Sequence, residues 1–448
     1  MTTRRAFLGA TAASGLATSL LSDQIHPKKP ASPNDRIQIA LIGCGGQGQD
    51  DAKASVSTNL TKLVAACDCY DGRLQHMKEL YGRDTFTTKN YEEILARPDI
   101  DAVLIGTPDH WHQKVTIDAL NAGKDVYCEK PMVQHIDQGL AVVDAKRRTN
   151  RILQIGSQRV SSVIYQKARD LFRSGAIGKL NLVEAWYDRN SAIGAWEYTI
   201  PPDASPVTCD WNRFQGSALR ADWDPKRFFR WRCYRDYGTG VAGDLFVHLF
   251  SGLHFITGAV GPSRVFATGG LRFWKDGRDV PDVLIGLYDY AESPNHPAFN
   301  LVMRTNFVDG ARENSGFRFT GSDAIMNVDR QVTLTAPPPE TEPEYTIETF
   351  SDAEQKAFLE QYRRRYPEVQ PVAAALKADK QETYVAPHGY SDHFAHHLNF
   401  ANAIRSRQPV VEDAVFGFRA AAPALLSNVS YFENRIVEWD PNEMKVRS

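Results

Sequence analysis

The stretch that decides the fold is Ile37-Gln-Ile-Ala-Leu-Ile-Gly43-Cys-Gly45-Gly-Gln-Gly48. Its first half is a largely apolar run of strand length, which predicts a buried parallel strand. The glycines that follow have the spacing G-x-G-x-x-G. Gly43 permits a tight turn, Gly45 lets the backbone approach a pyrophosphate, and Gly48 lets the next helix pack on the strand. The stretch therefore predicts a strand, a phosphate-binding loop and a helix whose amino end faces the phosphates.

A second strand carries an acidic residue at its end. Leu63–Cys67 is apolar, and Asp68 follows it directly. A carboxylate at this position accepts hydrogen bonds from ribose hydroxyls and repels a 2′-phosphate, which favours NAD over NADP as cofactor. Arg73 leaves the choice open, since it either turns toward a 2′-phosphate or stays exposed on its helix. The loop residues Gly46 and Gln47 complete this part of the predicted cofactor site.

The segment 31–158 alternates strands and helices. Three further runs of strand length follow the first two, at Ala102–Ile105, Lys124–Cys128 and Ile152–Ile155. Such alternation predicts an α/β domain with a doubly wound parallel sheet, the Rossmann arrangement. Ligands of these sheets bind outside the carboxyl ends of the strands, so the chemistry is expected there.

After residue 158 the alternation of strands and helices ends, and a helix is followed by long strand-like runs. These runs are 180–187, 265–271, 283–290, 299–306 and 316–319. They predict an α+β domain over 159–448, with an open, mostly antiparallel sheet and helices on one face. Pro337–Pro339 opens a charged excursion that is predicted to be an insertion near 337–387. Because an open sheet face invites pairing, a homo-oligomer is expected.

Composition excludes several classes of protein. The 448 residues are 42% hydrophobic and 24% charged, with a formal net charge of −2 at pH 7. These values are ordinary for a globular chain and give no reason to expect a nucleic acid or an anionic membrane as partner. After residue 22 no apolar run has the length of a membrane span, so the mature chain is not expected to be an integral membrane protein. The six cysteines suggest neither a disulfide framework nor a zinc site.

Residues 1–22 have the features of an export signal. Arg4-Arg5 precedes Phe7-Leu8 and then an uncharged run of small residues that ends at Leu21. The pattern resembles a twin-arginine signal, which directs folded proteins across a bacterial membrane. We expect residues 1–30 to be signal and linker, the twin-arginine export machinery to be a partner, and the mature protein to be periplasmic. Because a periplasm holds little free nicotinamide cofactor, the cofactor is expected to be tightly bound before export.

Three residues are candidates for proton transfer. Lys130 follows a strand, and Pro131 restricts its backbone. Asp244 and His248 have the i, i+4 spacing of one helix face, after a glycine-rich turn and among apolar neighbours. A carboxylate beside an imidazole orients it as a proton acceptor. Taken singly, the three also fit plainer roles as a surface lysine, a capping aspartate and a core histidine.

With these residues in view, the chain resembles the glucose–fructose oxidoreductase, inositol dehydrogenase and rhizopine-catabolism (Gfo/Idh/MocA) family. The resemblance covers nearly everything from Ile37 to Pro441. It rests on the glycine loop, the helix with Asp244 and His248, and the motifs Thr107-Pro108-Asp-His110-Trp111-His112, Ala122-Gly-Lys-Asp-Val-Tyr-Cys-Glu129-Lys130-Pro131, Gln154-Ile-Gly-Ser-Gln158-Arg159 and Glu438-Trp-Asp-Pro441.

The resemblance implies an NAD(P)-dependent enzyme that acts on a sugar or cyclitol hydroxyl. By similarity, Lys130 and His248 handle the proton of the substrate hydroxyl, and Asp244 positions the substrate and His248. The resemblance places His112 near the nicotinamide and lets Glu129 support the cofactor pocket. The complete set that it places at the cofactor, beyond the glycine loop, is Thr107, Pro108, His112, Glu129 and Lys130.

Side chains that suit a polyol are also present. Arginine offers a fixed fork of donors, and aromatic faces suit the C–H surfaces of sugars. The expected substrate-binding residues are Lys130, Arg159, Arg232, Tyr237, Asp244 and His248, with Arg230 and Trp231 as further candidates.

A histidine cluster near the C-terminus raises the question of a metal. His393 and His397 share a helix face at a spacing that can bind a metal, and His396 and Asp392 stand beside them. The pattern lacks the glutamate of a metalloprotease helix. No metal is therefore assigned.

Two enzymatic hypotheses and one binding hypothesis result. The leading one is an oxidoreductase that transfers hydride between a sugar, glycoside or cyclitol hydroxyl and a tightly bound nicotinamide cofactor. The second is a redox-neutral NAD-dependent glycosidase or lyase that acts through a transient 3-keto sugar, against which the presence of Lys130 argues. The third is a non-catalytic sensor, which the intact set of Lys130, Asp244 and His248 disfavours.

Overall fold

The structure is a computed structural model that describes residues 35–311, 313–337, 346–365 and 381–447. The predicted twin-arginine segment and linker, residues 1–30, lie outside the described residues. Within the predicted insertion, helix α11 (Asp352–Arg365) and strand β14 (Gln381–Val385) are described.

The first domain is built on a parallel sheet of six strands in the order β3-β2-β1-β4-β5-β6. Its central strands are almost wholly buried, as expected for a sheet covered on both faces. This confirms the predicted Rossmann arrangement. The strands are β1 (Ile37–Ile42), β2 (Thr61–Cys67), β3 (Phe86–Thr88), β4 (Ala102–Ile105), β5 (Asp125–Glu129) and β6 (Leu153–Gly156), and the helices are α2 (Gly46–Ser57), α3 (Asp71–Tyr81), α4 (Tyr91–Leu95), α5 (Asp109–Asn121) and α6 (Gly139–Thr149).

The second domain contains a sheet of ten strands in the order β14-β13-β12-β11-β7-β10-β9-β8-β15-β16. Neighbouring strands run antiparallel except β7 and β10, which confirms the predicted mostly antiparallel sheet. Besides β14, the strands are β7 (Leu180–Asp188), β8 (Arg264–Gly270), β9 (Val283–Tyr290), β10 (Phe299–Asn306), β11 (Asn314–Gly321), β12 (Ile325–Val328), β13 (Gln331–Thr335), β15 (Val437–Asp440) and β16 (Lys445–Val446).

One face of the large sheet is covered and the other is open. Helices α7 (Val163–Arg173), α10 (Val247–Thr257) and α13 (Ala414–Glu433) pack with the sheet in one hydrophobic core. Burial alternates along β9 and β10, as expected for a half-buried strand. On the outer face of β9, Ile285 and Leu287 are 39% and 48% exposed.

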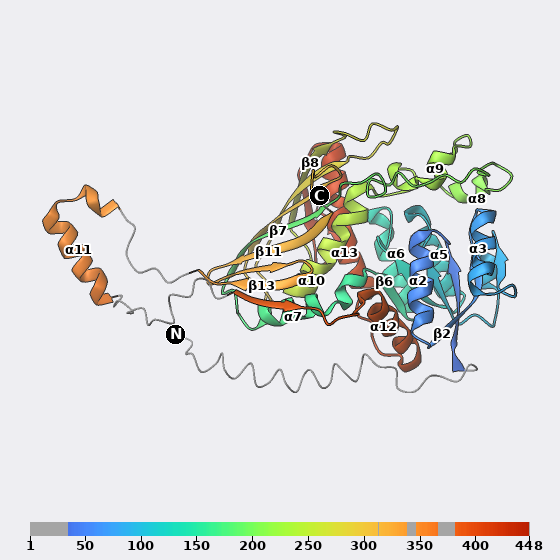
Figure 1. The fold of residues 1–448 in the computed structure, drawn as a ribbon, viewed down its shortest axis with the longest axis horizontal. Coiled ribbons are helices and arrows are strands. Elements are labelled where there is room, and N and C mark those ends of the chain that lie inside the picture. The colour runs from blue at the N-terminus through green and yellow to red at the C-terminus, as the bar shows by residue number, and fades with distance from the viewer. Residues whose placement is uncertain (1–34, 312, 338–345, 366–380, 448) are drawn as a thin grey trace.

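The end of the chain returns to the first domain. Helix α12 (Asp392–Ser406) lies beside α2 and the Rossmann sheet in Figure 1. Its apolar side chains, among them Phe400 and Ile404, share a core with Ile39 and Leu41 of β1. The segment predicted as one second domain, 159–448, therefore supplies a helix to the first domain.

An irregular excursion, residues 199–229, extends over the Rossmann domain and is called the cap here. It contains the short helices α8 (Trp211–Gln215) and α9 (Pro225–Phe229), which lie above α3 in Figure 1. The backbone N–H of Asp71 donates to Thr208 O (3.0 Å), and that of Asp210 donates to Cys69 O (2.8 Å). The cap thus joins the two domains across the carboxyl end of β2.

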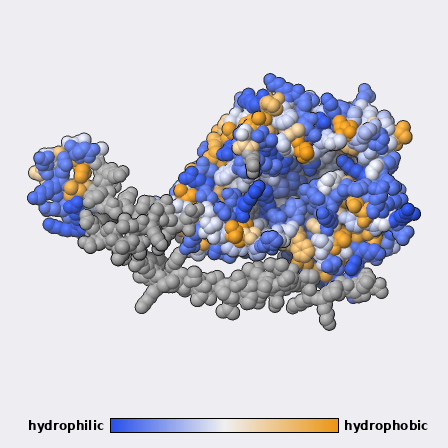
Figure 2. Space-filling model, viewed as in Figure 1, coloured by the Kyte–Doolittle hydropathy of each residue, from blue (hydrophilic) through white to orange (hydrophobic). Residues whose placement is uncertain are grey.

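The face of the molecule drawn in Figure 2 is mostly hydrophilic, with hydrophobic residues scattered over it. Within the described ranges, no helix combines the length and the hydropathy that a membrane span requires. All six cysteines carry free thiols.

Candidate active site

A cavity of about 680 Å³ lies where the two domains and the cap meet. Its walls come from the glycine loop, from the ends of β2, β4 and β5, from the start of the α10 helix, and from the cap. The predicted residues that line it are Gly43, Gly45, Gly46, Gln47, Asp68, Arg73, Thr107, Pro108, Lys130, Arg159, Arg232, Asp244 and His248. The structure therefore brings most of the predicted site together.

The glycine loop has the geometry that its spacing predicts. Gly43 has a φ of +93°, and a Cβ there would lie 2.5 Å from the backbone of Gly106. Gly48 does not line the cavity but packs against the loop, where a Cβ would lie 2.1 Å from the carbonyl oxygen of Gly43. At Gly46, by contrast, a Cβ would meet nothing within 4 Å. The loop is closed toward the sheet and open toward the cavity.

The residues present fit a dinucleotide. Helix α2 begins at Gly46 behind Gly45, with no side chain capping its amino end and no acidic residue in its first turn. Its free N–H groups therefore face the cavity and can hold a pyrophosphate. The Asp68 carboxylate accepts hydrogen bonds from the N–H groups of Cys44 (2.7 Å) and Tyr70 (2.9 Å). These bonds fix the carboxylate at the end of β2, where a ribose is expected.

Arg73 lies between the Asp68 carboxylate and the cap. Its guanidinium lies 3.5 Å from the Asp68 carboxylate and 5.5 Å from the centre of the Phe229 ring in the cap. Its side chain is 30% exposed and lines the cavity. Asp68 thus restrains a group that could otherwise pair with a 2′-phosphate.

We expect Asp68→Ser to raise the preference for NADP relative to NAD by about tenfold, because it removes the repelling charge and releases Arg73. Serine keeps an acceptor for the loop N–H groups. Titration of nucleotide-free protein with both cofactors measures the ratio of dissociation constants. Asp71→Ser is the matched control, since Asp71 is 54% exposed and pairs with Lys89; an unchanged ratio in Asp68→Ser would exclude Asp68 as the selecting residue.

Lys130 and Asp244 form an ion pair across the two domains. Lys130 Nζ donates to Asp244 Oδ1 (2.8 Å) and to the Asp244 carbonyl oxygen (3.1 Å). Arg232 Nε donates to the same Oδ1 (3.2 Å). Although burial acts in the opposite direction, the charges of Lys130 and Arg232 hold the pKa of Asp244 well below its ordinary value. An ammonium has three N–H donors, so one remains for a substrate oxygen.

The helix that carries Asp244 is not regular. Residues Ala242–Phe246 form a π-helical turn that leads into α10. Such turns are rare and frequently occur at functional sites. The predicted contact within this helix is wrong: among the described contacts, no hydrogen bond joins Asp244 to His248. The Asp244 carboxylate is held by Lys130 and Arg232 instead, so it positions them rather than the imidazole.

His248 lines the cavity from the next helical turn. Its ring lies 6.0 Å from the ring of Tyr187, centre to centre, and its Nδ1 is buried without a hydrogen-bond partner. Burial, followed by the charges of Lys130 and Arg159, lowers the pKa of His248 well below its ordinary value of 6.5. The imidazole is therefore neutral near neutral pH and can accept a proton.

The motif Thr107–His112 joins the first domain to the second domain and to the cap through side-chain hydrogen bonds. Asp109 Oδ2 accepts hydrogen bonds from Thr239 N (2.9 Å) and Oγ1 (2.6 Å), just before the π-helical turn. Trp111 Nε1 donates to Phe214 O in the cap (2.9 Å). The two ring nitrogens of His112 lie 2.7 Å from Pro131 O and 2.9 Å from Thr107 O. The motif fixes the loops that carry the site.

Three predicted contacts with ligand are therefore corrected. His112 is 1% exposed and lies behind the cavity wall, because both ring nitrogens face backbone carbonyls. Tyr237 is fully buried and packs on the rings of His110 (5.3 Å) and Phe214 (5.2 Å), so it does not reach a substrate. Arg230, a further candidate, pairs with Glu197 outside the cavity lining.

Glu129 contacts two glutamines that line the cavity. Gln158 Nε2 donates to Glu129 Oε1 (2.5 Å) and to the Tyr127 hydroxyl (2.9 Å). Gln47 Nε2 lies 3.4 Å from the same Oε1 and 3.2 Å from Asp51. Burial raises the pKa of Asp51 to about 8 and that of Glu129 well above its ordinary value. The two carboxyl groups hold Gln47 and Gln158, which line the cavity.

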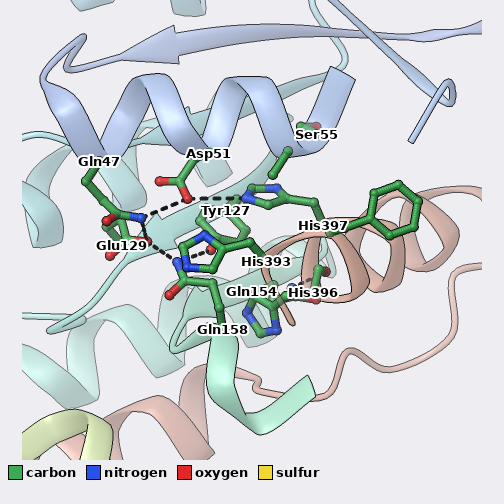
Figure 3. A network of polar contacts seen from close by, with 12 residues as sticks. Gln47, Asp51, Ser55, Tyr127, Glu129, Gln154, Gln158, His393, His396 and His397 are labelled. Atoms are coloured by element: carbon green, nitrogen blue, oxygen red, sulfur yellow. Dashed lines mark hydrogen bonds and ion pairs between the residues drawn. The ribbon is translucent and has the colours of Figure 1, made fainter. Parts of the chain in front are cut away.

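The histidines of α12 diverge (Figure 3). His396 lies with Nδ1 2.8 Å from Ser161 Oγ and Nε2 2.8 Å from Ile155 O. His397 lies 3.3 Å from Asp51 and stacks on Tyr127. His393 lines the cavity with Asp392. In the described part of the chain, no three metal-ligating side chains gather at one point; His396 and His397 join α12 to the Rossmann domain.

The cavity also contains residues that the sequence did not single out. Tyr187 and Arg189 come from the end of β7, and Tyr198 and Thr199 come from the point where the chain enters the cap. The pattern of β7 alone marks a half-buried strand. Arg189 stands next to the buried Asp188, but no local signal shows which end of the sheet faces the cofactor domain.

Comparisons with known proteins agree with this geometry. Residues 37–157 match the family model of the GFO/IDH/MocA proteins, whose description is "Oxidoreductase family, NAD-binding Rossmann fold". Inositol 2-dehydrogenase of Gluconacetobacter diazotrophicus is 30% identical over 161 residues, which are 35% of this chain and 47% of that protein. The same enzyme of Salmonella typhimurium is 28% identical over 167 residues, 37% of this chain and 49% of that protein. The chain thus spans about half the length of the curated relatives it matches.

Solved structures resemble most of the chain. An oxidoreductase domain protein from Kribbella flavida has a TM-score of 0.63 at 18% identity and covers 90% of this chain and 99% of that one. Levoglucosan dehydrogenase in complex with NADH and levoglucosan has a TM-score of 0.61 at 17% identity, over 90% of this chain and 99% of that one. At these identities the likeness shows a shared two-domain fold.

Proposed function

We propose that the whole chain belongs to the Gfo/Idh/MocA family and is an NAD-dependent dehydrogenase of a sugar, glycoside or cyclitol hydroxyl. The observation that carries this proposal is the pair of Lys130 and Asp244, which reaches across the domains beside His248 in the cavity that the glycine loop opens into. The match of residues 37–157 to an NAD-binding family supports the cofactor. The inositol 2-dehydrogenases and levoglucosan dehydrogenase among the similar proteins support the substrate class.

Three residues of the chain have separate roles in the proposed reaction. Bound NAD supplies the hydride acceptor. His248, neutral near pH 7, accepts the proton of the substrate hydroxyl. Lys130 donates its remaining N–H to the same oxygen and stabilises the negative charge that develops there. Asp244 keeps the ammonium in place through two hydrogen bonds, so the donor is oriented before the substrate arrives.

The pH dependence follows from the neutral imidazole. Because the pKa of His248 is lowered, protonation that stops proton acceptance requires a pH below 6.5. We expect the acid limb of kcat/KM for oxidation to have its midpoint below 6.5. Arg159→Gln removes one of the charges that lower this pKa and is expected to move the midpoint upward. A pH–rate profile of the two proteins measures both, and a wild-type midpoint at or above 6.5 would contradict the assignment of His248.

The experiment that tests the proposed function starts from full-length protein purified without added cofactor. The nucleotide is released and identified, and the holoenzyme is incubated with sugars, cyclitols and aryl glycosides. A keto sugar formed with reduction of the nucleotide supports a dehydrogenase. A released aglycone with no net redox change would instead support the redox-neutral glycosidase. If neither product forms from any of these compounds although NAD is bound, the proposal is wrong.

We further propose that NAD is retained rather than exchanged. The cap supports retention, because it forms hydrogen bonds with the segments that follow β2 and β3. Tyr70 donates its hydroxyl proton to Asp203 (2.6 Å), and Lys89 Nζ donates to Thr208 O (3.3 Å). Retention agrees with the proposed export of the folded protein by the twin-arginine route to the periplasm. Cell fractionation of the full-length chain and of an Arg4→Lys, Arg5→Lys variant tests the location.

A homo-oligomer is proposed as well. The open face of the large sheet exposes Ile285 and Leu287 on one strand. Exposed apolar side chains on a broad sheet are typical of an interface between copies. The molar mass of the purified protein in solution tests this proposal.

A further inference from the structure

We propose that the substrate is an acidic carbohydrate, whose carboxylate or sulfate group binds between Arg159 and Arg189 beside His248. This inference rests on the proposed function, since it names the substrate class of the same cavity. Neither relatives nor neighbours supply it: the names inositol 2-dehydrogenase and levoglucosan dehydrogenase refer to uncharged compounds.

The substrate end of the cavity has an excess of positive charge. Lys130, Arg159, Arg189 and Arg232 line it. All except Arg159 have a carboxylate within ion-pair distance, but Lys130 and Arg232 share the single carboxylate of Asp244. Among the carboxylates of the described ranges, Arg189 reaches Glu313, at 3.6 Å, and that side chain is 54% exposed. Asp392 is the other acidic residue that lines this end, so the four positive side chains have two carboxylates in the cavity lining and the exposed Glu313 outside it.

Arg159 is the cation without an ionic partner. Among the described residues, no carboxylate lies within ion-pair distance of its guanidinium. Its Nη1 donates to Ser315 Oγ (2.8 Å), and its other terminal nitrogen lies 3.5 Å from the Tyr187 hydroxyl. A partly buried guanidinium that has hydrogen bonds but no carboxylate partner is suited to bind the anionic group of a ligand.

Both arginines lie near the ring of Tyr187. Their guanidinium carbons lie 5.2 Å (Arg159) and 5.3 Å (Arg189) from the centre of the Tyr187 ring. Arg189 is held by a hydrogen bond from its Nη1 to Gly194 O (3.0 Å) and is 18% exposed. Tyr187 in turn lies 6.0 Å from His248, ring to ring. An anion bound by these forks therefore places the attached sugar ring against the proton acceptor.

The cofactor does not neutralise these charges. Its phosphates are expected at the glycine loop, where Arg73, Lys89 and Arg213 line the other end of the cavity. An oxidised nicotinamide adds positive charge at the substrate end. An uncharged polyol would leave Arg159 without an anionic partner and Arg189 with the exposed Glu313, whereas a planar carboxylate or a tetrahedral sulfate matches the arginine donors.

The test uses the full-length holoenzyme and pairs of compounds that differ in one group. Methyl β-glucuronide and methyl β-glucoside differ only by a carboxylate in place of a hydroxymethyl group, and glucose 6-sulfate provides the tetrahedral anion. Binding is measured by calorimetry, and the keto product is measured by mass spectrometry. The variants are Arg159→Gln, Arg189→Gln and the charge-conserving Arg159→Lys. Arg147→Gln is the control, since its side chain is 79% exposed on α6 and pairs with Asp144, away from the cavity lining.

We expect an acidic compound to bind at least about tenfold more tightly than its neutral partner and to be oxidised faster. Arg159→Gln and Arg189→Gln should remove this preference, because each weakens the binding of the acidic compound more than that of its neutral partner. Arg159→Lys should retain part of the preference, and Arg147→Gln all of it. The bound NAD content shows that each variant is folded. The better of the glucuronide and the sulfate identifies the anion.

The outcomes separate this inference from the proposed function. Equal or better oxidation of the neutral glucoside overturns the acidic substrate and leaves the dehydrogenase standing. Arginine-dependent binding of the anions without oxidation of any compound supports the anion site and overturns the dehydrogenase. A preference that survives in both glutamine variants overturns the assignment to Arg159 and Arg189. Absence of both binding and oxidation overturns both proposals.

Discussion

Replacing Lys130 with methionine is expected to lower kcat for hydroxyl oxidation by about 10³-fold, within the range typical of a lost proton-handling group, while NAD stays bound. Methionine keeps the volume of the side chain but has no N–H donor and no charge. The Asp244 carboxylate would then be held by Arg232 alone. The loss should appear in kcat more than in KM, because the donor acts on the charge that develops during the reaction.

The measurement is single-turnover oxidation with the nucleotide content determined for each preparation. Lys114→Met is a matched control, since Lys114 is 55% exposed and its ammonium pairs with Asp118 on α5. Its kcat should equal that of the unmodified protein. If Lys130→Met retains near-normal turnover, the mechanism proposed for this site is wrong.

The second large effect is expected from Gly48→Ala. The added Cβ would lie 2.1 Å from the carbonyl oxygen of Gly43 and 3.3 Å from Leu41 Cδ1. Backbone on both sides has to move, so the free energy of unfolding should fall by about 3 kcal/mol, the upper part of the range for overpacked sites. Since the moving atoms form the phosphate-binding turn, NAD binding should also weaken.

Gly46→Ala serves as the comparison within the same loop. A Cβ at Gly46 meets nothing within 4 Å, and alanine favours the helix that begins there. Calorimetric unfolding of the nucleotide-free proteins should show a lower midpoint for Gly48→Ala and no decrease for Gly46→Ala. Equal midpoints would show that packing at Gly48 does not limit the loop.

Most of the features that could be predicted from the sequence were marked by local sequence patterns. The glycine spacing, the strand before it and Asp68 after the second strand act within a short stretch of chain, and each is where it was expected. The position of Lys130 also follows from the strand before it. These features depend on backbone geometry that neighbouring residues determine.

Contacts between distant segments could not be derived in this way. Helix periodicity led us to expect a contact between Asp244 and His248. Asp244 instead lies in a π-helical turn and pairs with Lys130 of the other domain. Tyr237 suited a sugar by its chemistry, yet packing against His110 turns it inward. Arg189 gave no sequence signal at all, because its importance depends on which sheet end meets the cofactor domain.

Helix α12 has a consequence for the order in which the protein folds. The sheet of the first domain is completed by residue 156, but its hydrophobic core includes Phe400 and Ile404. The nucleotide-binding domain therefore cannot finish packing on the ribosome until nearly the whole chain has been synthesised. A fragment that stops after the sixth strand therefore lacks part of the core that supports its own glycine loop.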